Sequence, residues 1–303
     1  MPKSIQRIVI AGDAENRLFE ETAQAILRFL AHRHVQAASF GWARPPAPTL
    51  DPQTPPEGFA RLAQASDLII VLGGDGTFLR MATASAAWQV PLLGINLGRL
   101  GFLSDISPDD LMNSLEEILD GHGRLEQRML LSGRITHGRE ERLLRLALNE
   151  VCLLKAEPGR IIECSLAIDQ QWISQHRADG MLCATPTGST AYALSSGGPV
   201  LHPDVPAMVV VPICPHTLSD RPLVLPAGAT VAFHVKPGGA ALVMWDGHHQ
   251  HQLMPGEFVE ITASPHRLPL LHPRGYNYFQ LLRHKLLWGS PPQHSTPTSS
   301  PPS

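Results

Sequence analysis

A short apolar segment that runs directly into a glycine-rich turn constrains this chain more than any other feature. Residues 68–72 read LIIVL, typical of a buried strand, and the turn that follows reads Gly73-Gly74-Asp75-Gly76. Glycines let the backbone approach a ligand closely, and successive N–H groups in such a turn can point at phosphate oxygens. A carboxylate beside phosphate is repelled unless a divalent cation bridges the two groups or the carboxylate accepts a proton from an attacking hydroxyl. Both options indicate phosphoryl transfer, whereas the alternative is an Asp-Gly hairpin turn between two strands.

Length and composition indicate a globular protein with two domains. The chain has 303 residues, of which 43% are hydrophobic, enough for ordinary buried cores. Its formal charge is −3, from 24 Lys plus Arg and 27 Asp plus Glu, so no basic field predicts a nucleic-acid or membrane partner. No apolar run is long enough for a signal peptide or a membrane span, which predicts a cytoplasmic location. The cysteines form no C-x-x-C pair and are expected to be reduced core thiols: Cys152, Cys164, Cys183 and Cys214.

Strands alternate with helices in the first part of the chain. Residues 7–11 read as a buried strand, and Asn16 is a suitable N-cap for the helix that follows. After the glycine turn we expect a helix over 77–87, a second buried strand over 91–96 and a second glycine loop over 98–102. This order favours a parallel sheet with its ligand crevice at the carboxyl ends of the strands, where both glycine loops lie.

Two further segments of this part have clear boundaries. Residues 107–110 read Ser-Pro-Asp-Asp, a strong helix start with Ser107 as the cap, and Gly121 is expected to end that helix. Residues 41–58 contain six prolines, which predicts an exposed loop without regular structure.

The pattern then changes to short apolar or alternating runs, which predicts a β-rich second domain. The expected strands cover 129–136, 143–154, 161–168, 208–213, 230–235, 241–245 and 258–262. A last helical run over 278–287 is too isolated for a sandwich, so the C-terminal segment is expected to return to the first domain. The predicted division is 1–124 for an α/β domain with a parallel sheet and the GGDG loop, 125–271 for an all-β domain, 272–289 for the returning segment and 290–303 for a disordered Ser/Pro-rich tail.

The common nucleotide and hydrolase motifs are missing from the sequence. The chain contains no Gly-Lys dipeptide, so it has no Walker P-loop, and Leu79 stands where a dinucleotide fingerprint needs its third small residue. H-E-x-x-H and G-x-S-x-G are also absent, which argues against zinc proteases and the usual serine hydrolases. If ATP binds, it binds through a motif other than a Walker P-loop or a dinucleotide fingerprint.

Asn149 and Glu150 lie in the middle of the apolar run LRLALNEVCLL. An unpaired buried carboxylate is unfavourable by several kcal/mol, so Glu150 needs a donor. A ribose diol is one candidate, because its two hydroxyls match two carboxylate oxygens. A buried salt bridge to an arginine, or a strand edge at which the pair faces water, are the alternatives.

A second segment rich in hydroxyl groups and glycines runs from Asp179 to Pro199. Its centre, Pro-Thr-Gly-Ser-Thr followed by Ala-Tyr-Ala-Leu, predicts a turn around Gly188 that leads into a helix N-terminus, which suits an anion or polar ligand. Tyr192 could stack on a base. The alternative is a capped helix after a turn, with Tyr192 in the core.

Further candidates for ligand contact are basic residues near the turns. Arg80 and Arg99 flank the two glycine loops, where they could meet phosphate or simply solvate helix ends. His248, His249 and His251 follow Trp245-Asp246-Gly247 at an expected hairpin turn. A metal site is disfavoured there, because neighbouring side chains in a turn point in different directions.

Taken together, these segments resemble the bacterial NAD kinase (ATP-NAD kinase) family. The resemblance covers roughly residues 68–289 and is specific because several blocks occur in order. They are GGDGTFLR at 73–80, PLLGINLGRLGFLSDI at 91–106, LNEV at 148–151, DGMLCATPTGSTAYALSSGGP at 179–199, ICPHTLSDRPLVLP at 213–226 and HPRGYNYFQLLRHKLLWG at 272–289.

The resemblance implies transfer of the ATP γ-phosphate to the 2′-hydroxyl of the adenosine ribose of NAD, with a divalent cation such as Mg²⁺ and a homodimeric or homotetrameric assembly. By position it assigns Asp75 as the general base and places Gly76 beside the nicotinamide nucleotide. Asn149 and Glu150 are assigned to ribose hydroxyls and Asp179 to the nicotinamide side. The residues assigned to the adenosine half are Thr190, Ala191, Tyr192, Ala193, Leu194 and Ser195. Arg160 and Arg177 match positions used around NAD. His248 stands where the family often has Gln after Asp-Gly, and it is counted among the cofactor-binding residues although its side chain differs.

Two other functions compete with this interpretation. Lipid kinases share the GGDGT turn but need an acyl pocket and give no reason for the blocks around Glu150 and Tyr192. A noncatalytic dinucleotide sensor could keep the site and lose turnover, but binding alone does not require a base such as Asp75 beside phosphates.

Overall fold

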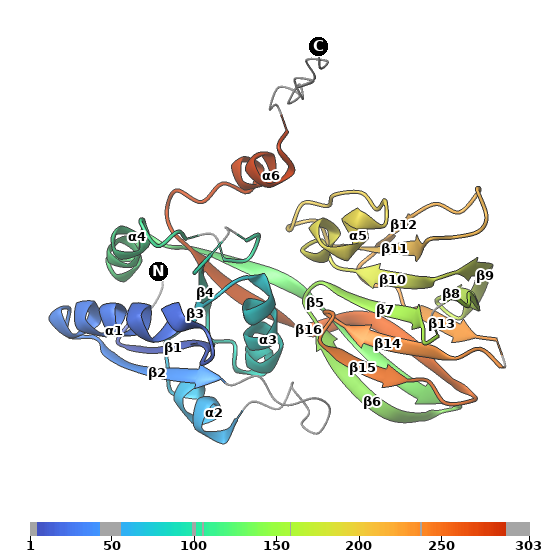
Figure 1. Cartoon of the computed structure of the whole chain (residues 1–303), viewed down its shortest axis with the longest axis horizontal. Coiled ribbons are helices and arrows are strands. Elements are labelled where there is room, and N and C mark those ends of the chain that lie inside the picture. Colours follow the sequence, from blue (N-terminus) through green and yellow to red (C-terminus); the bar gives the residue numbers. More distant parts are fainter. Residues whose placement is uncertain are drawn as a thin grey trace, which may run out of the picture.

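The computed structural model describes residues 5–42, 56–98, 101–104, 106–157, 159–236 and 238–288. The strands form two sheets, a ten-stranded sheet that runs through both halves of the chain and a six-stranded sheet in the second half (Figure 1). No helix among these residues is both long and apolar enough to cross a membrane.

The first half is a parallel sheet with helices on both faces. Its strands are β1 (Arg7–Asp13), β2 (Gln36–Trp42), β3 (Leu68–Leu72) and β4 (Leu92–Ile95), in the order β2-β1-β3-β4. The helices are α1 (Arg17–His32), α2 (Glu57–Gln64), α3 (Asp75–Ser85) and α4 (Leu111–Leu119), and a 3-10 turn, η1 (Ala86–Trp88), follows α3. Apolar side chains fill both faces, with Phe59 and Phe78 in one core and Phe19 and Leu115 in the other. The predicted α/β domain with a parallel sheet is confirmed.

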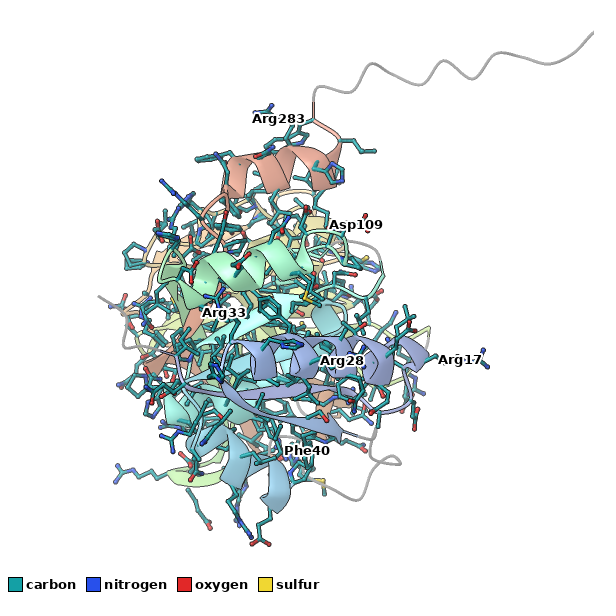
Figure 2. All side chains as sticks on the ribbon, turned by 90° about the vertical axis from the view of Figure 1, so that its left-hand side faces the viewer. Arg17, Arg28, Arg33, Phe40, Asp109 and Arg283 are labelled. Carbon is teal, nitrogen blue, oxygen red and sulfur yellow. The ribbon has the colours of Figure 1, made fainter. Side chains whose placement is uncertain are left out.

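Helix α1 begins as its sequence predicts. The backbone N–H of Leu18 donates to the side chain of Asn16 at 3.0 Å, which satisfies one of the free donors of the first turn. Just after α1, Arg33 forms ion pairs with Glu116 of α4, at 2.9 Å, and with Asp120. The two helices therefore lie on the same face of the sheet (Figure 2).

Several boundaries in this half differ from the prediction. The helix expected over 77–87 begins at Asp75, because Gly74 already serves as its N-cap. The helix expected at Ser107 begins at Leu111, since the Ser107 hydroxyl instead closes a turn with the Asp110 carboxylate at 2.7 Å. Strand β2 and helix α2 were not predicted, and they include both ends of the loop expected over 41–58, of which 43–55 lie outside the described residues.

The second half is mainly a sandwich of antiparallel strands, as predicted. The ten-stranded sheet continues with β5 (Arg124–His137), β6 (Glu140–Ala147), β8 (Ile162–Ile168), β9 (Gln171–Ala178), β13 (Val231–Val235) and β16 (Glu257–His272). The six-stranded sheet has the order β12 (Leu223–Pro226), β11 (Ala207–Ile213), β10 (Gly180–Ala184), β7 (Glu150–Lys155), β14 (Ala241–Trp245) and β15 (His249–Gln252). Their facing sides bury one core that includes Phe233 and Trp245.

Two expectations for this half were wrong. The apolar run 143–154 is not one strand, because the chain passes from one sheet to the other between β6 and β7, at Leu148 and Asn149. Cys214 is exposed after the end of β11 and is not a core thiol, whereas Cys152, Cys164 and Cys183 are buried and free. The short strands β9, β10, β12 and β15 were not predicted.

Strand β16 already reaches the first domain, before the segment 272–289 for which this return was predicted. Its first part pairs with β13 and β5 in the sandwich, and Leu270 near its end pairs in parallel with Leu92 of β4. Helix α6 (Tyr278–Leu286) follows, close to the predicted 278–287. At its start the Tyr278 hydroxyl donates to the Leu201 carbonyl at 3.3 Å, and near its end Lys285 lies 5.8 Å from the Phe102 ring. The sheet is thus continuous, and the predicted residue boundaries of the domains stay a prediction.

Candidate active site

Asp75 is the first residue of α3 and follows directly from the buried strand β3 through Gly73 and Gly74. Its carboxylate accepts hydrogen bonds from the N–H of Phe102 at 2.9 Å and the N–H of Leu103 at 3.0 Å. The hydroxyl of Ser104 donates a third, at 3.3 Å. The turn therefore joins a strand to a helix and is not a hairpin, and the Asp75 side chain is held in one orientation.

The second glycine loop supplies these donors. A Cβ atom on Gly101 would lie 2.6 Å from Cγ of Asp75, so only glycine fits there without displacing the carboxylate. The Asn96 side chain donates to the Ser104 hydroxyl at 3.1 Å and accepts from the N–H of Gly98. The loop was predicted as a second ligand loop, and in the structure part of it is the support of Asp75. Arg99 lies outside the described residues.

The hairpin between β14 and β15 brings the six-stranded sheet to α3. As predicted, a turn follows Trp245, and the His248 N–H closes it on the Trp245 carbonyl at 3.0 Å. The Nε2 atom of His248 lies 3.0 Å from the carbonyl oxygen of Gly76. This contact places His248, Gly76 and Asp75 together, although the first is 172 residues away from the second in sequence.

Asp246, in the same turn, fixes the Asn-Glu pair. Its buried carboxylate accepts from the N–H groups of Leu148 at 2.8 Å, Asn149 at 2.7 Å and Glu150 at 3.1 Å. Burial raises the pKa of Asp246 to about 6, although these three hydrogen bonds act in the opposite direction. Sequence reasoning did not single out this residue, and its only signal was an Asp between a strand-end Trp and a turn Gly.

Glu150 is a buried carboxyl group with a free acceptor. It is 6% exposed, the Tyr192 N–H donates to it, and its Oε2 atom has no hydrogen-bond partner among the described residues. Burial and the nearby charge of Asp246 raise the pKa of Glu150 to about 8. Neither alternative considered from the sequence holds, since within the described part of the chain Glu150 has no arginine partner and does not face water. Such a group is suited to a ligand that brings hydroxyl donors.

The segment 185–195 packs against the Asn-Glu pair. The N–H of Thr185 donates to the Asn149 carbonyl at 2.9 Å, and its hydroxyl donates to the Leu148 carbonyl at 2.5 Å. Gly188 comes so close that a Cβ there would lie 2.6 Å from Cα of Asn149. A 3-10 turn, η2 (Gly188–Thr190), and a single helical turn, α5 (Tyr192–Ser195), follow.

Tyr192 is on the surface and not in the core. Its side chain is 38% exposed, whereas its neighbour Ala193 is buried against β10 and β11. Burial raises the pKa of Tyr192, and the charges of Asp179 and Glu150 contribute in the same direction.

The remaining predicted residues are less closely joined to this network. Asp179 forms an ion pair with Lys155 at 2.6 Å, at the opposite end of the β7–β10 ladder from Glu150. Arg177 pairs with Glu163 at 3.7 Å. Arg160 forms an ion pair with Glu157 at 3.1 Å. Arg80 is buried within α3.

The chain matches two family models that together cover most of its length. They are the ATP-NAD kinase N-terminal domain, over residues 9–123, and the ATP-NAD kinase C-terminal domain, over residues 148–272. An NAD kinase of Thiobacillus denitrificans is 42% identical over 281 residues, which cover 92% of this chain and 96% of that protein. An NAD kinase of Chromohalobacter salexigens is 42% identical over 272 residues, covering 89% and 92%.

Solved structures agree with these matches. The crystal structure of a yeast NADH kinase complexed with NADH has a TM-score of 0.79 at 24% identity, over 97% of this chain and 91% of that one, and supports the fold. An NAD kinase from Archaeoglobus fulgidus in complex with ATP gives a TM-score of 0.73 at 25% identity, over 93% and 99%. Since both halves match in order and over nearly the full length, this protein belongs to the NAD kinase family.

Proposed function

We propose that this enzyme transfers the γ-phosphate of ATP to the 2′-hydroxyl of the adenosine ribose of NAD, with Asp75 as the general base. Phosphorylation of NAD is the activity of the family to which the chain belongs, and neither a GGDGT lipid kinase nor a noncatalytic sensor is favoured beside it. The assignment of Asp75 rests on one observation above all, the fixed position of its carboxylate at the start of α3.

A general base has to lie within hydrogen-bond reach of the hydroxyl that it activates. Phosphoryl transfer depends mainly on positioning and on stabilising charge, so a rigid carboxylate suits this step. Three donors orient Asp75, and the open N-terminal turn of α3 beside it carries free backbone N–H groups that favour phosphate oxygens. The role of Asp75 is then to accept the proton of the 2′-hydroxyl while the α3 N-terminus faces the phosphate chain.

The surrounding groups would hold NAD. Asn149 and Glu150 are proposed to bind ribose hydroxyls, because the free Oε2 of Glu150 can accept from a diol. The other proposed contacts are Thr190, Ala191, Tyr192, Ala193, Leu194 and Ser195 for the adenosine half, Asp179 for the nicotinamide side and Gly76 beside the nicotinamide nucleotide. Arg160 and Arg177 are proposed to lie around NAD, Arg80 to meet phosphate, and His248 to be a further cofactor contact.

A divalent cation, Mg²⁺ first of all, is part of the proposal. Among the described residues no three His, Cys, Asp or Glu side chains converge as a dedicated metal cage. This fits Mg²⁺, which is usually held by one or two carboxylates together with substrate phosphates and water. When bound, the cation would neutralise phosphate charge, and Asp75 would be the carboxylate that this proposal places beside the phosphates.

We also propose a cytoplasmic homodimer or homotetramer. The observation that supports an assembly is the position of Arg160 and Arg177, which are expected around NAD but form surface ion pairs in a single chain. A second copy could bring such residues to a neighbouring site.

The test is NADP formation by the purified protein from NAD, ATP and Mg²⁺, read out with glucose-6-phosphate dehydrogenase. We expect activity that EDTA abolishes and that excess Mg²⁺ restores. Asp75→Asn should lower kcat by at least about a hundredfold, the usual contribution of a general base, while calorimetry finds NAD binding little changed. Full activity of Asp75→Asn would remove Asp75 from this role.

A further inference from the structure

Arg128 of β5 is a buried arginine that the proposed site does not use. Its side chain is only 4% exposed, and it forms an ion pair with Glu126 at 2.7 Å. The remaining donors of its guanidinium point at two other segments. Nη1 lies 3.3 Å from the Thr187 hydroxyl, and Nη2 lies 3.2 Å from the Tyr276 hydroxyl. One side chain thus joins β5, the turn before η2 and the segment after β16.

A buried guanidinium is tolerated only where a charge and hydrogen bonds compensate for its lost hydration. Glu126 supplies the charge. Burial alone would raise the pKa of Glu126, but the neighbouring His272, 3.6 Å away, and the charge of Arg128 outweigh it and lower the pKa to about 2. Glu126 is therefore ionised, and Arg128 has its remaining donors available to hold Thr187 and Tyr276.

The contact with Thr187 leads directly into the proposed nucleotide-binding segment. Thr187 is 7% exposed and precedes Gly188, and its carbonyl accepts from the Thr190 hydroxyl at 3.1 Å. The Ala191 N–H then bonds to the Gly188 carbonyl at 2.9 Å, and the next N–H, that of Tyr192, donates to the Glu150 carboxyl. A shift of Thr187 would be passed on through this series of hydrogen bonds.

The segment after β16 supports the same turn from a second side. The Tyr276 ring stacks on His272 with ring centroids 3.8 Å apart, which orients its hydroxyl toward Arg128. The Tyr278 hydroxyl bonds to the Leu201 carbonyl, and the Leu201 N–H donates to the Ser189 hydroxyl at 2.9 Å. The turn 187–190 is therefore held at Thr187 and at Ser189 by groups that lie outside the turn.

We propose that Arg128 is a positioning residue for NAD, which sets the place of the Thr187–Tyr192 segment through its hydrogen bond to the Thr187 hydroxyl. The inference rests on the proposed function, since this segment is the expected adenosine contact. It assigns Arg128 an effect on NAD binding that a purely structural ion pair would not have. Loss of the contact should raise the KM for NAD and leave kcat and the KM for ATP nearly unchanged.

Thr187→Val tests this with the smallest change, because valine keeps the shape of threonine and removes only the hydroxyl. We expect the KM for NAD to rise about tenfold, the ratio expected when one hydrogen bond to a charged group is lost. Thr187→Ser keeps a hydroxyl and should restore the wild-type value. Arg134→Gln is the matched control, because Arg134 lies on the same strand but pairs at the surface with Glu141 and Glu260.

The outcomes separate the inference from the proposed function. No NADP from the wild type would refute the proposed function, and calorimetric Kd values for NAD would still compare the variants. An unchanged Kd and KM for NAD in Thr187→Val would overturn the role of Arg128, as would an equal increase in Arg134→Gln. If Thr187→Val fails to fold, Tyr276→Phe, which removes another partner of Arg128, should raise the KM for NAD in the same direction, and no increase there would also overturn it.

Discussion

At the residue scale, the two carboxylates at the centre of the site have opposite surroundings. Asp75 is partly exposed, and two N–H groups and a hydroxyl fix both of its oxygens. Glu150 is buried beside Asp246 and keeps one oxygen without a donor within the described residues. A carboxylate that is already oriented suits proton acceptance, whereas a buried carboxyl gains most from a ligand that brings hydroxyl groups. Their surroundings therefore fit the two different tasks proposed for them.

The stability of the protein should depend on pH through Glu150. Its pKa is about 8 in the folded chain against an ordinary value of 4.5. The unfolded chain releases this proton at lower pH than the folded chain does. The free energy of unfolding therefore falls as the pH rises from 4.5 to about 8 and levels off above that range. Since one pKa unit corresponds to about 1.36 kcal/mol, Glu150→Gln should be stabilised over the wild type by roughly a few kcal/mol at about pH 8 and by little at about pH 4. Urea unfolding at both pH values measures the difference.

Glu141→Gln is the matched control for this measurement, because Glu141 is 49% exposed and pairs with Arg134 at the surface. Its stability should follow that of the wild type at both pH values. If Glu150→Gln and the wild type lose stability equally with rising pH, the Glu150 carboxyl is not held neutral by burial.

At the element scale, the site is built from turns at the ends of strands, and each turn is fixed by another one. The loop after β4 donates hydrogen bonds to Asp75. The β14–β15 hairpin contacts Gly76 with its His248 and the junction of β6 and β7 with its Asp246. Loops are mobile unless such contacts restrain them. The rigid geometry of the active site is therefore a property of paired turns.

Gly101→Ala should damage catalysis through this pairing. The new Cβ would lie 2.6 Å from Cγ of Asp75, so the carboxylate or the loop has to move. A displacement of about 1 Å at a reacting group can lower turnover by about a hundredfold, and we expect kcat to fall by roughly tenfold to a hundredfold. Gly228→Ala, where a Cβ meets nothing within 4 Å, is the control and should keep wild-type kcat. Equal kcat in both variants would mean that the position of Asp75 does not limit the reaction.

The elements that sequence predicted well are those with local signals. Asn16 before α1 and the glycines after β3 were found because capping residues and turn residues act within a few positions. Strands β2 and β9 were missed because most of their residues are exposed or half-buried, so they lack a continuous apolar run. The break between β6 and β7 was missed because both sides of it are apolar.

At the scale of the whole molecule, the active site depends on contacts between residues far apart in sequence. Asp75 and Glu150 could be singled out from the sequence, because each is a carboxylate in or beside an apolar strand. Asp246 and Arg128 could not, since their partners at Asn149 and Thr187 are 97 and 59 positions away. Local patterns carry no information on such pairs, which arise only when strands of the second half that are distant in sequence, such as β7 and β14, come together in the fold.

The proposed assembly also depends on the arrangement of the whole molecule, because it requires an exposed edge of the sheet. Strand β9 lies at one edge of the ten-stranded sheet and carries Arg177, which is expected near NAD but forms an ion pair at the surface with Glu163. Trp172 and Ile173 on this strand are 68% and 43% exposed. An edge strand with exposed apolar side chains is an association surface unless it is covered. A second copy packed on β9 would cover these side chains and bring Arg177 toward a neighbouring site.

Trp172→Glu should therefore dissociate the assembly and impair NAD binding together. A buried, unpaired carboxylate at an interface is strongly unfavourable, so light scattering should show the monomer mass, and the KM for NAD should rise by about tenfold or more. Trp288→Glu is the control, because Trp288 is similarly exposed, at 54%, but follows α6 on a different surface. If Trp288→Glu dissociates the protein and Trp172→Glu does not, the copies meet at α6 instead of β9. If Trp172→Glu gives a monomer with an unchanged KM for NAD, each chain contains a complete site and Arg177 does not act across the interface.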